Sequence, residues 1–272
     1  MKHCLTIAGS DSCGGAGIQA DLKAFSANGT YGMSVITAIT AQNTQGVFDV
    51  QDINPSVIAH QIEAIFDDIR VDAIKIGMVS RPETIEIIAA TLKKYPLPPL
   101  VIDPVMISKS GYDLLQPEAK KALIEILLPM ATLITPNLPE AEVIVGYKID
   151  TIELMQKAAL DLHKLGCKYV LVKGGHLEND ATDVLYDGEA FHLLHSKRLE
   201  TINTHGTGCT LSSAIAANLA KGLHVKAAVE AAKAYITEAI THGFKLGHGV
   251  GPVHHFYALY TKAGMELSLI HI

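Results

Sequence analysis

The sequence predicts an α/β fold in which a mainly parallel central sheet is covered by helices. Short, almost uninterrupted apolar runs of strand length alternate with longer amphipathic segments of helix length through the first two thirds of the chain. Uninterrupted apolar runs are typical of strands buried on both faces, and intervening helices are typical of parallel sheets. Because ligands bind at the carboxyl ends of such strands, we expect functional side chains directly after them.

The elements follow from this alternation and from their boundary residues. Pro82 and Pro117 suit the first turn of a helix, where the missing N–H of proline costs no hydrogen bond. The expected strands are 5–9, 34–41, 73–77, 100–103, 133–136 and 169–173, and the expected helices between them are 15–28, 55–68, 82–94, 117–128, 138–145 and 151–165.

The pattern changes after residue 180. Two apolar runs within 182–199 are separated by Asp187-Gly188, which is a typical hairpin turn. Two long helices are expected next, at 208–221 and 225–242, and the first of them is rich in alanine. The chain has no repeat, low-complexity tract or linker that would divide it, so we expect one domain over residues 1–272.

Composition narrows the function classes. The 272 residues are 49% hydrophobic and 18% charged, which is enough to bury one substantial core. A formal net charge of -6 gives no reason to expect nucleic acid or an anionic membrane as a partner. No apolar run approaches the length of a membrane span or a signal peptide, so a cytoplasmic protein that binds small molecules is expected.

A glycine turn precedes the expected helix at 208–221. In Gly206-Thr207-Gly208-Cys209, successive backbone N–H groups should point out of the helix N-terminus, where anions bind. Such donors stabilise the charge of a phosphoryl group during transfer. A thiol at this position is expected to have a lowered pKa, which would make Cys209 a base or a polar neighbour of the reacting atoms. The alternative is an ordinary glycine-containing helix start with a buried cysteine.

A second glycine run, at residues 9–17, follows the first strand. It lacks the GxxxxGK[ST] pattern of a P-loop and is not a clean GxGxxG, and no acidic residue follows the second strand to bind a dinucleotide ribose. A dinucleotide-binding dehydrogenase is therefore disfavoured. The thirteen histidines show no HExxH or convergent metal spacing, so structural or surface roles are expected for them.

A series of ordered motifs spans nearly the whole chain, up to about residue 262. Together they resemble the hydroxymethylpyrimidine and phosphomethylpyrimidine kinases of thiamin biosynthesis, in the pyridoxal kinase-like branch of the ribokinase-like superfamily. The motifs are LTIAGSD at 5–11, GGAGIQADLK at 14–23, AQNTQGV at 41–47, KIGM at 75–78, DPVM at 103–106, TPNLPEAE at 135–142, KGGH at 173–176, HGTGCT at 205–210 and GPVHHF at 251–256.

The resemblance implies a three-layer α/β/α fold and a kinase that uses ATP and Mg²⁺. It also implies two reactions, in which the hydroxymethyl group of 4-amino-5-hydroxymethyl-2-methylpyrimidine is phosphorylated and the monophosphate is phosphorylated again. A homodimer is expected on the same ground. The glycine turn becomes the anion hole, with Gly206, Thr207 and Gly208 around the phosphoryl group. Most sugar kinases of the superfamily have an Asp as base at the place of Cys209.

Five residues are implied on the substrate side: Gly9, Asp21, Gln42, Met78 and Val105. The Gln42 amide offers both a donor and an acceptor, which suits the amino group and ring nitrogen of an aminopyrimidine. Asp21 could accept a hydrogen bond from the same heterocycle. The alternatives are an exposed loop position for Gln42 and a surface helix position for Asp21.

On the nucleotide side, Asn137 and Glu140 match the NxxE motif of the superfamily, which positions Mg²⁺ through water. Asp103 ends an apolar strand and would share the ion, since Mg²⁺ takes few protein carboxylates and keeps several waters. Lys173 would pair with the ATP phosphates, and Thr207 would donate to them. For Asp103 the alternative is a turn-forming role before proline, and for Lys173 and Thr207 it is a structural role.

The alternative activity is that of a pyridoxal, pyridoxine or pyridoxamine kinase of the same branch. Pyridoxal kinases with two cysteines carry one of them in the lid-like segment 105–112, where this chain has Ser108. The run Gln42-Asn43-Thr44 also looks like the pyrimidine kinases. A binding protein without catalysis is disfavoured, because every expected catalytic residue type is present. Residues 263–272 extend beyond the family match.

Overall fold

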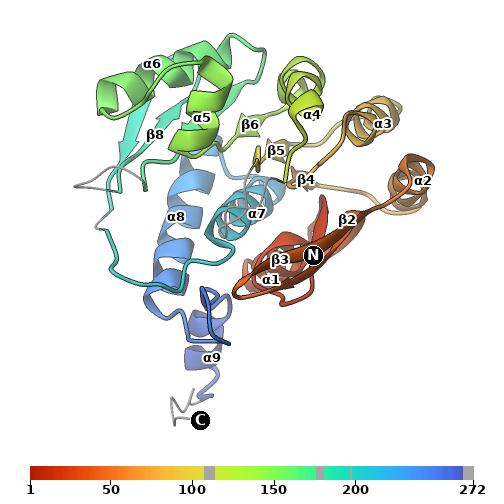
Figure 1. The fold of residues 1–272 in the computed structure, drawn as a ribbon. Coiled ribbons are helices and arrows are strands. Elements are labelled where there is room, and N and C mark those ends of the chain that lie inside the picture. The colour runs from red at the N-terminus through yellow and green to blue at the C-terminus, as the bar shows by residue number, and fades with distance from the viewer. Residues whose placement is uncertain (107–113, 176–180, 197, 266–272) are drawn as a thin grey trace.

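The computed structural model describes residues 1–106, 114–175, 181–196 and 198–265, which form a nine-stranded sheet with helices on both faces (Figure 1). The strand order is β3-β2-β1-β4-β5-β6-β7-β8-β9. The neighbouring strands β2, β1, β4, β5, β6 and β7 all run parallel. Strands β3, β8 and β9 are each antiparallel to their neighbour on the inner side of the sheet. The predicted α/β/α fold with a mainly parallel sheet is thus confirmed. The strands are β1 (His3–Asp11), β2 (Tyr31–Asn43), β3 (Gly46–Asp52), β4 (Ala73–Ile76), β5 (Leu100–Ile102), β6 (Leu133–Ile134), β7 (Tyr169–Val172), β8 (Asp183–Tyr186) and β9 (Phe191–Leu194).

The helices agree with the sequence prediction to within a few residues at most ends. Among the described residues they are α1 (Gly17–Ala27), α2 (Pro55–Phe66), α3 (Pro82–Leu92), α4 (Pro117–Ala122), α5 (Leu138–Val145), α6 (Ile152–His163), α7 (Thr207–Ala220), α8 (Val225–Thr241) and α9 (Tyr257–Lys262).

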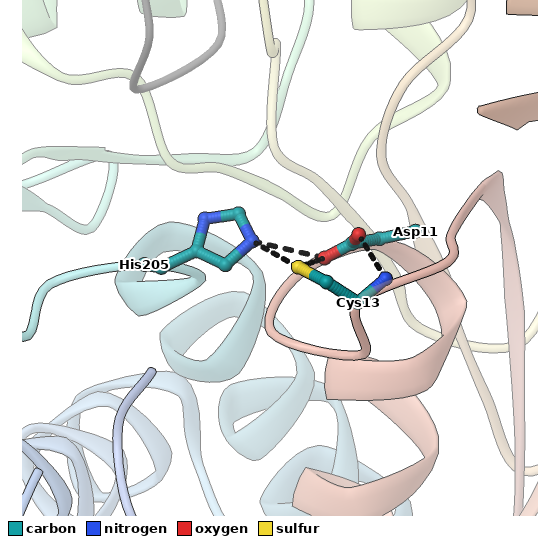
Figure 2. Close-up of side chains that lie close together, drawn as sticks. All are labelled: Asp11, Cys13 and His205. Atoms are coloured by element: carbon teal, nitrogen blue, oxygen red, sulfur yellow. Dashed lines mark hydrogen bonds and ion pairs between the residues drawn. The ribbon is translucent and has the colours of Figure 1, made fainter. Parts of the chain in front are cut away.

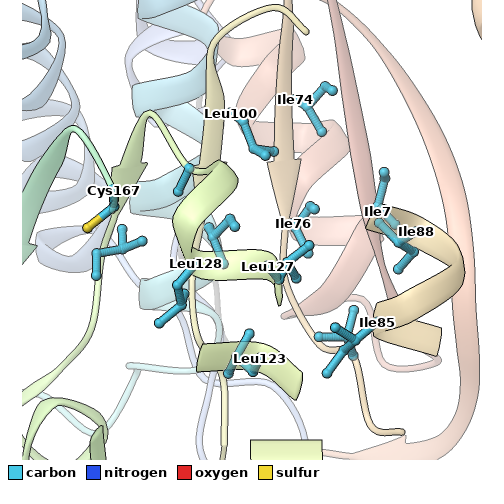
Figure 3. Packing of buried hydrophobic residues seen from close by; sticks show 14 of the residues in the cluster. Ile7, Ile74, Ile76, Ile85, Ile88, Leu100, Leu123, Leu127, Leu128 and Cys167 are labelled. Atoms are coloured by element: carbon cyan, nitrogen blue, oxygen red, sulfur yellow. The ribbon is translucent and has the colours of Figure 1, made fainter. Parts of the chain in front are cut away.

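The two faces of the sheet carry separate cores. In β5, Leu100 and Ile102 point to one face and Val101 to the other, as the two-residue period of a strand requires. The first face packs against α2 to α6, and part of this core is drawn in Figure 3. The second face packs against α1, α7 and α8 (Figure 1). Helix α7, on the second face, lies directly against the strands that lead to the site.

Three elements differ from the sequence prediction. The antiparallel strand β3 and the short helix α9 were not predicted. The expected helix at 117–128 is α-helical only to Ala122, and it continues as a π-helical turn over Leu123–Leu127 and a 3₁₀ turn over Leu128–Met130. Pro129 lacks the N–H that a continuing helix needs, which accounts for the end of this helix next to Pro129. No helix within the described ranges is long and apolar enough to cross a membrane.

Candidate active site

Residues at the ends of four strands lie at one edge of the sheet. Asp11 and Gln42 lie in the last residues of β1 and β2, whereas Asp103 and Lys173 directly follow β5 and β7. All four strands run parallel, so their carboxyl ends point the same way. The N-terminus of α7 lies at the same edge. The structure therefore brings the expected nucleotide and substrate residues to the expected side of the fold.

The glycine turn forms the N-terminus of α7. Gly206 is left-handed, with φ of 79°, and a Cβ there would overlap the carbonyl oxygen of Gly15, so this position requires glycine. The first helical hydrogen bond runs from the Thr210 amide to the Gly206 oxygen at 2.9 Å. The amides of Gly208 and Cys209 precede that bond and have no acceptor within the helix. They are donors suited to an anion.

A buried hydroxyl secures this turn. The Thr210 hydroxyl donates to the Gly206 oxygen at 2.8 Å and lies 2.9 Å from His255 Nε2. Burial, with smaller effects of Lys23 and His254, lowers the pKa of His255 to about 3, so the ring is neutral. His255 thus has the structural role expected for it, because its ring contacts the threonine hydroxyl that holds the glycine turn.

Lys173 and the Asp103 carboxylate lie against Gly208. The Lys173 ammonium donates to Asp103 Oδ1 at 2.8 Å, and the Thr135 hydroxyl donates to the same oxygen at 3.0 Å. A Cβ on Gly208 would stand 3.1 Å from Asp103 Oδ2 and 3.4 Å from Lys173 Nζ. Burial alone would lower the pKa of Lys173, but Asp103 and Glu140 raise it above its usual range. The lysine is therefore charged beside the helix N-terminus.

Asn137 and Glu140 form a capping box at the start of α5. The Asn137 amide donates to Glu140 Oε2 and the Glu140 amide donates to Asn137 Oδ1, both at 2.8 Å. Burial raises the pKa of Glu140 to about 7 against the lowering effect of Lys173, and Asp103 adds to the rise. A divalent cation beside the Glu140 and Asp103 carboxylates would relieve the repulsion between them. Hard oxygen donors are the ligands that Mg²⁺ prefers, so the residues fit such an ion.

Cys209 differs from the expectation. Its pKa is raised to about 11 instead of lowered, because burial outweighs the nearby Lys75 ammonium and a hydrogen bond from the Gly17 amide, and the Asp21 charge adds to the rise. The thiol is therefore protonated at neutral pH. In this structure Cys209 is a polar neighbour of the anion site and not a ready base.

This raised pKa predicts slow alkylation. Moving the pKa from 9.0 to about 11 lowers the thiolate fraction at pH 7.5 on the order of 100-fold. Iodoacetamide should therefore modify Cys209 about 100-fold more slowly in the folded protein than in the urea-unfolded chain. The rate for the folded protein should rise about tenfold per pH unit up to about pH 11. Peptide mass spectrometry measures it, and fast alkylation of Cys209 below pH 8 would contradict the assignment.

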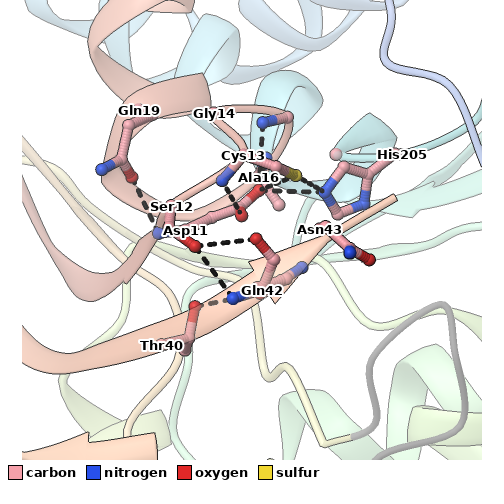
Figure 4. A network of polar contacts seen from close by, with 12 residues as sticks. Asp11, Ser12, Cys13, Gly14, Ala16, Gln19, Thr40, Gln42, Asn43 and His205 are labelled. Carbon is pink, nitrogen blue, oxygen red and sulfur yellow. Dashed lines mark hydrogen bonds and ion pairs between the residues drawn. The ribbon is translucent and has the colours of Figure 1, made fainter. Parts of the chain in front are cut away.

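A pocket of about 440 Å³ opens beside the turn. It is lined by the β2–β3 connection (42–46), by Ile202 and His205, and by residues 248–250. Gln42 is held in its wall, because its backbone N–H and C=O both bond the Ser12 hydroxyl, at 2.8 and 2.7 Å (Figure 4). The Thr40 hydroxyl donates to Gln42 Oε1 at 3.2 Å. The polar end of Gln42 is thus fixed at the pocket.

The sequence from the end of β1 to the segment after α8 matches one family. Residues 11–254 fit the family model described as phosphomethylpyrimidine kinase. The chain belongs to the phosphomethylpyrimidine kinase family. A hydroxymethylpyrimidine/phosphomethylpyrimidine kinase of Rhizobium meliloti is 54% identical over 93% of this chain and 96% of its own length.

Solved structures of this family and of a related activity are similar. A phosphomethylpyrimidine kinase of Clostridium difficile has a TM-score of 0.80 and 57% identity, covering 88% of this chain and 100% of its own. An ADP complex of a Bacillus subtilis pyridoxal kinase has a TM-score of 0.89 and 46% identity, covering 95% of this chain and 99% of its own. The ribokinase-like fold expected for the phosphomethylpyrimidine kinase family is therefore shown.

Three of the expected substrate residues of this phosphomethylpyrimidine kinase family member lie at inner strand ends. Gly9 lies next to Met78, because a Cβ on Gly9 would stand 3.0 Å from the Met78 sulfur. The Val105 backbone N–H donates to the backbone carbonyl oxygen of Asp103 at 2.8 Å, in the turn that follows β5. Ser108 and the rest of the lid-like segment after Met106 lie outside the described residues, as do residues 266–272.

The Asp21 side chain lies among polar partners from other elements. Its carboxylate is fully buried and receives both contacts of the Lys75 ammonium at 2.9 Å, the Thr6 hydroxyl at 2.6 Å and the Ser213 hydroxyl at 2.7 Å. The contact of Asp21 with a heterocycle stays a prediction. Its partners come from β1, β4 and α7, so Asp21 ties α7 to the sheet. Lys75 had no role in the sequence prediction.

The sequence prediction also assigned no role to Asp11, and it expected for His205, as for the other histidines, only a structural or surface role. His205 Nε2 lies 2.9 Å from Asp11 Oδ2 (Figures 2 and 4). Burial alone would raise the pKa of Asp11, but hydrogen bonds from His205, Ala16 and Cys13 lower it to about 2. The position of Asp11 at the end of a buried strand was the available signal.

Proposed function

We propose that this chain transfers a phosphoryl group from ATP to the hydroxymethyl group of 4-amino-5-hydroxymethyl-2-methylpyrimidine, and then phosphorylates that monophosphate. The observation that carries the proposal is the anion site at Gly208 and Cys209, with the charged Lys173 beside it, in a chain of the phosphomethylpyrimidine kinase family. The product would supply thiamin biosynthesis. We place this activity in the cytoplasm, where ATP is abundant.

The chain contributes position and charge. The Gly208 and Cys209 amides would hold the transferred phosphoryl group, the Thr207 hydroxyl would donate to the phosphates, and Lys173 would neutralise their charge. Gly206 gives the turn its shape. Phosphoryl transfer depends mainly on such positioning and electrostatic stabilisation. A protonated Cys209 thiol would then act as a hydrogen-bonding neighbour of the attacking hydroxyl.

Asp103 and Glu140 are the proposed carboxylates for Mg²⁺, in part through water, and Asn137 orients Glu140 through the capping box. When bound, the ion would neutralise charge on the phosphates. The raised pKa of Glu140, near 7, supports this assignment, because a carboxylate so placed gains most from a cation. Lys173 offsets part of the same negative charge from the other side.

Gln42 is proposed to recognise the aminopyrimidine, with Gly9, Met78 and Val105 lining the path toward the anion site.

A Gln42→Ala variant should therefore raise the KM for the pyrimidine about tenfold with little change in kcat, since one or two hydrogen bonds of about 1 kcal/mol are lost. Steady-state kinetics measures the split. Gln51→Ala, on the exposed neighbouring strand β3, is the matched control. An unchanged KM in Gln42→Ala would remove this assignment.

A coupled ADP-release assay tests the proposed activity. The pyrimidine alcohol, its monophosphate, pyridoxal and pyridoxine are supplied separately, and the first two are expected to turn over. A pyridoxal kinase activity is the second candidate, because the Bacillus subtilis pyridoxal kinase has a closely similar fold. Turnover of the vitamin B6 compounds alone would favour that candidate and reject the first.

We further propose a homodimer. Ile39 in β2 and Phe48 in β3 are 49% and 67% exposed at the antiparallel edge of the sheet. An exposed edge strand with apolar side chains is a ready surface for association. Sedimentation equilibrium should give twice the chain mass, and a Phe48→Asp variant should shift the equilibrium toward the monomer.

A further inference from the structure

Three side chains of different chemistry converge between the end of β1 and the start of α7 (Figure 2). Cys13 Sγ lies 3.4 Å from Asp11 Oδ2 and 3.5 Å from His205 Nε2, and that nitrogen lies 2.9 Å from the same oxygen. One thiol, one imidazole and one carboxylate therefore present ligand atoms to a common point. Asp11 and His205 are buried, and Cys13 is half-buried, so the cluster has one open side.

The cluster is held in place by close backbone contacts. Asp11 ends β1, Cys13 lies in the turn between β1 and α1, and His205 precedes α7, more than 190 residues later in the chain. A Cβ on Gly15 would overlap the His205 ring, so the absence of a side chain there lets the two segments meet. The amides of Gly15 and Ala16 donate to Asp11 Oδ2 at 3.0 and 2.8 Å, which orients the carboxylate.

The spacing suits a tetrahedral ion. Bonds of about 2.3 Å to sulfur and about 2.0 to 2.1 Å to nitrogen and oxygen place ligand atoms roughly 3.3 to 3.6 Å apart. The two sulfur distances already lie in this range, and the nitrogen–oxygen distance would have to widen by about 0.4 Å. We propose that Asp11, Cys13 and His205 form a three-ligand site for a zinc-like divalent transition-metal ion, with water at the open fourth position.

The donor set separates this site from the proposed Mg²⁺ carboxylates. A thiolate and an imidazole select borderline or soft ions, whereas Mg²⁺ prefers oxygen donors. The hydrogen bonds from Gly15 and Ala16 would serve as outer-shell contacts to the carboxylate ligand. Because His205 also lines the 440 Å³ pocket, a bound ion would lie in the pocket wall. The proposal does not depend on the identity of the kinase substrate.

Cobalt binding provides a direct test. Untagged, metal-free protein is titrated with Co²⁺ alone, in the presence of millimolar Mg²⁺, and the absorbance is followed in the near ultraviolet, where thiolate–cobalt charge transfer occurs, and in the visible. We expect a charge-transfer band that saturates at one ion per chain, with visible bands of tetrahedral intensity, and its displacement by Zn²⁺. A protein without the near-ultraviolet band would overturn the proposal.

Matched variants locate the ion. Cys13→Ser should abolish the band and weaken Zn²⁺ binding, measured by calorimetry, at least about 100-fold, because even the loss of an outer-shell partner costs about 10- to 100-fold. His205→Asn provides a second ligand deletion, and circular dichroism verifies that each variant is folded. Cys209→Ser, which removes the other thiol near the turn, should keep the band. A band that persists in folded Cys13→Ser, or disappears in Cys209→Ser, would reject the site.

Discussion

Replacing Lys75 by Met is expected to lower the free energy of unfolding by about 3 to 5 kcal/mol, because it leaves a buried carboxylate without its cation. Lys75 and Asp21 are both fully buried and 2.9 Å apart. Burial alone would lower the pKa of Lys75, but the Asp21 charge, together with smaller effects of Cys209, Asp103 and the hydrogen bond to Asp21, outweighs burial and raises the pKa. Met matches the length of the lysine stem, so the variant removes the charge with little change in packing volume. Urea denaturation measures the loss.

Lys94→Met is the control for this variant. Lys94 donates to Glu63 at 2.7 Å, but its side chain is 58% exposed, so the loss should be about 1 kcal/mol or less. If Lys75→Met and Lys94→Met lowered the free energy of unfolding equally, burial would not be what makes the Lys75–Asp21 ion pair costly to break. Because Ser213 of α7 also bonds Asp21, Lys75→Met should lower kcat as well, through displacement of the helix that carries the anion site.

Replacing Lys173 by Met should reduce kcat/KM for ATP-dependent phosphorylation by about 100- to 1,000-fold. Removal of one preorganised charge or donor at a transition state costs about this much. The Lys173 ammonium lies 2.8 Å from Asp103 and beside Gly208, where the phosphoryl group would bind. Its loss also leaves Asp103 and Glu140 without their cation. We expect the pKa of Glu140, already about 7, to rise further.

Lys148→Met serves as the matched control, because Lys148 forms an exposed ion pair with Glu142 at 2.8 Å, outside the strand ends that form the site. It should retain the kcat/KM of the parent chain. Thermal unfolding of both variants separates loss of charge from loss of fold. A folded Lys173→Met protein with unchanged kcat/KM would exclude Lys173 from the phosphate site.

The repetitive elements were predictable because their signals are local. The parallel strands are buried on both faces, so they appear in the sequence as apolar runs, and helices such as α5 begin at a capping residue and proline. Strand β3 was missed for the opposite reason. It is an edge strand of the sequence GVFDVQD without a buried residue, and its pairing with β2 supplies the hydrogen bonds that make it a strand.

Part of the site was predictable for a related reason. Asp103 and Lys173 each follow a buried strand, and parallel strands deliver such residues to one edge of the sheet. The family resemblance then connected that edge with phosphoryl transfer. The burial of Asp21 was not predictable, because a helix residue near the site has no local sign of burial. Its partners Lys75 and Ser213 lie 54 and 192 residues away.

The sequence by itself therefore determined the α/β class, the order of the predicted strands and helices, the strand ends that carry the site and the glycine turn before α7. Its periodicity and turn residues act over a few positions, which is why these features can be recognised without coordinates. Only the tertiary structure decided the state of Cys209 and the meeting of Asp11, Cys13 and His205. Desolvation and contacts between distant segments depend on how the whole chain packs, and they outweigh the local effect of a helix N-terminus on a thiol.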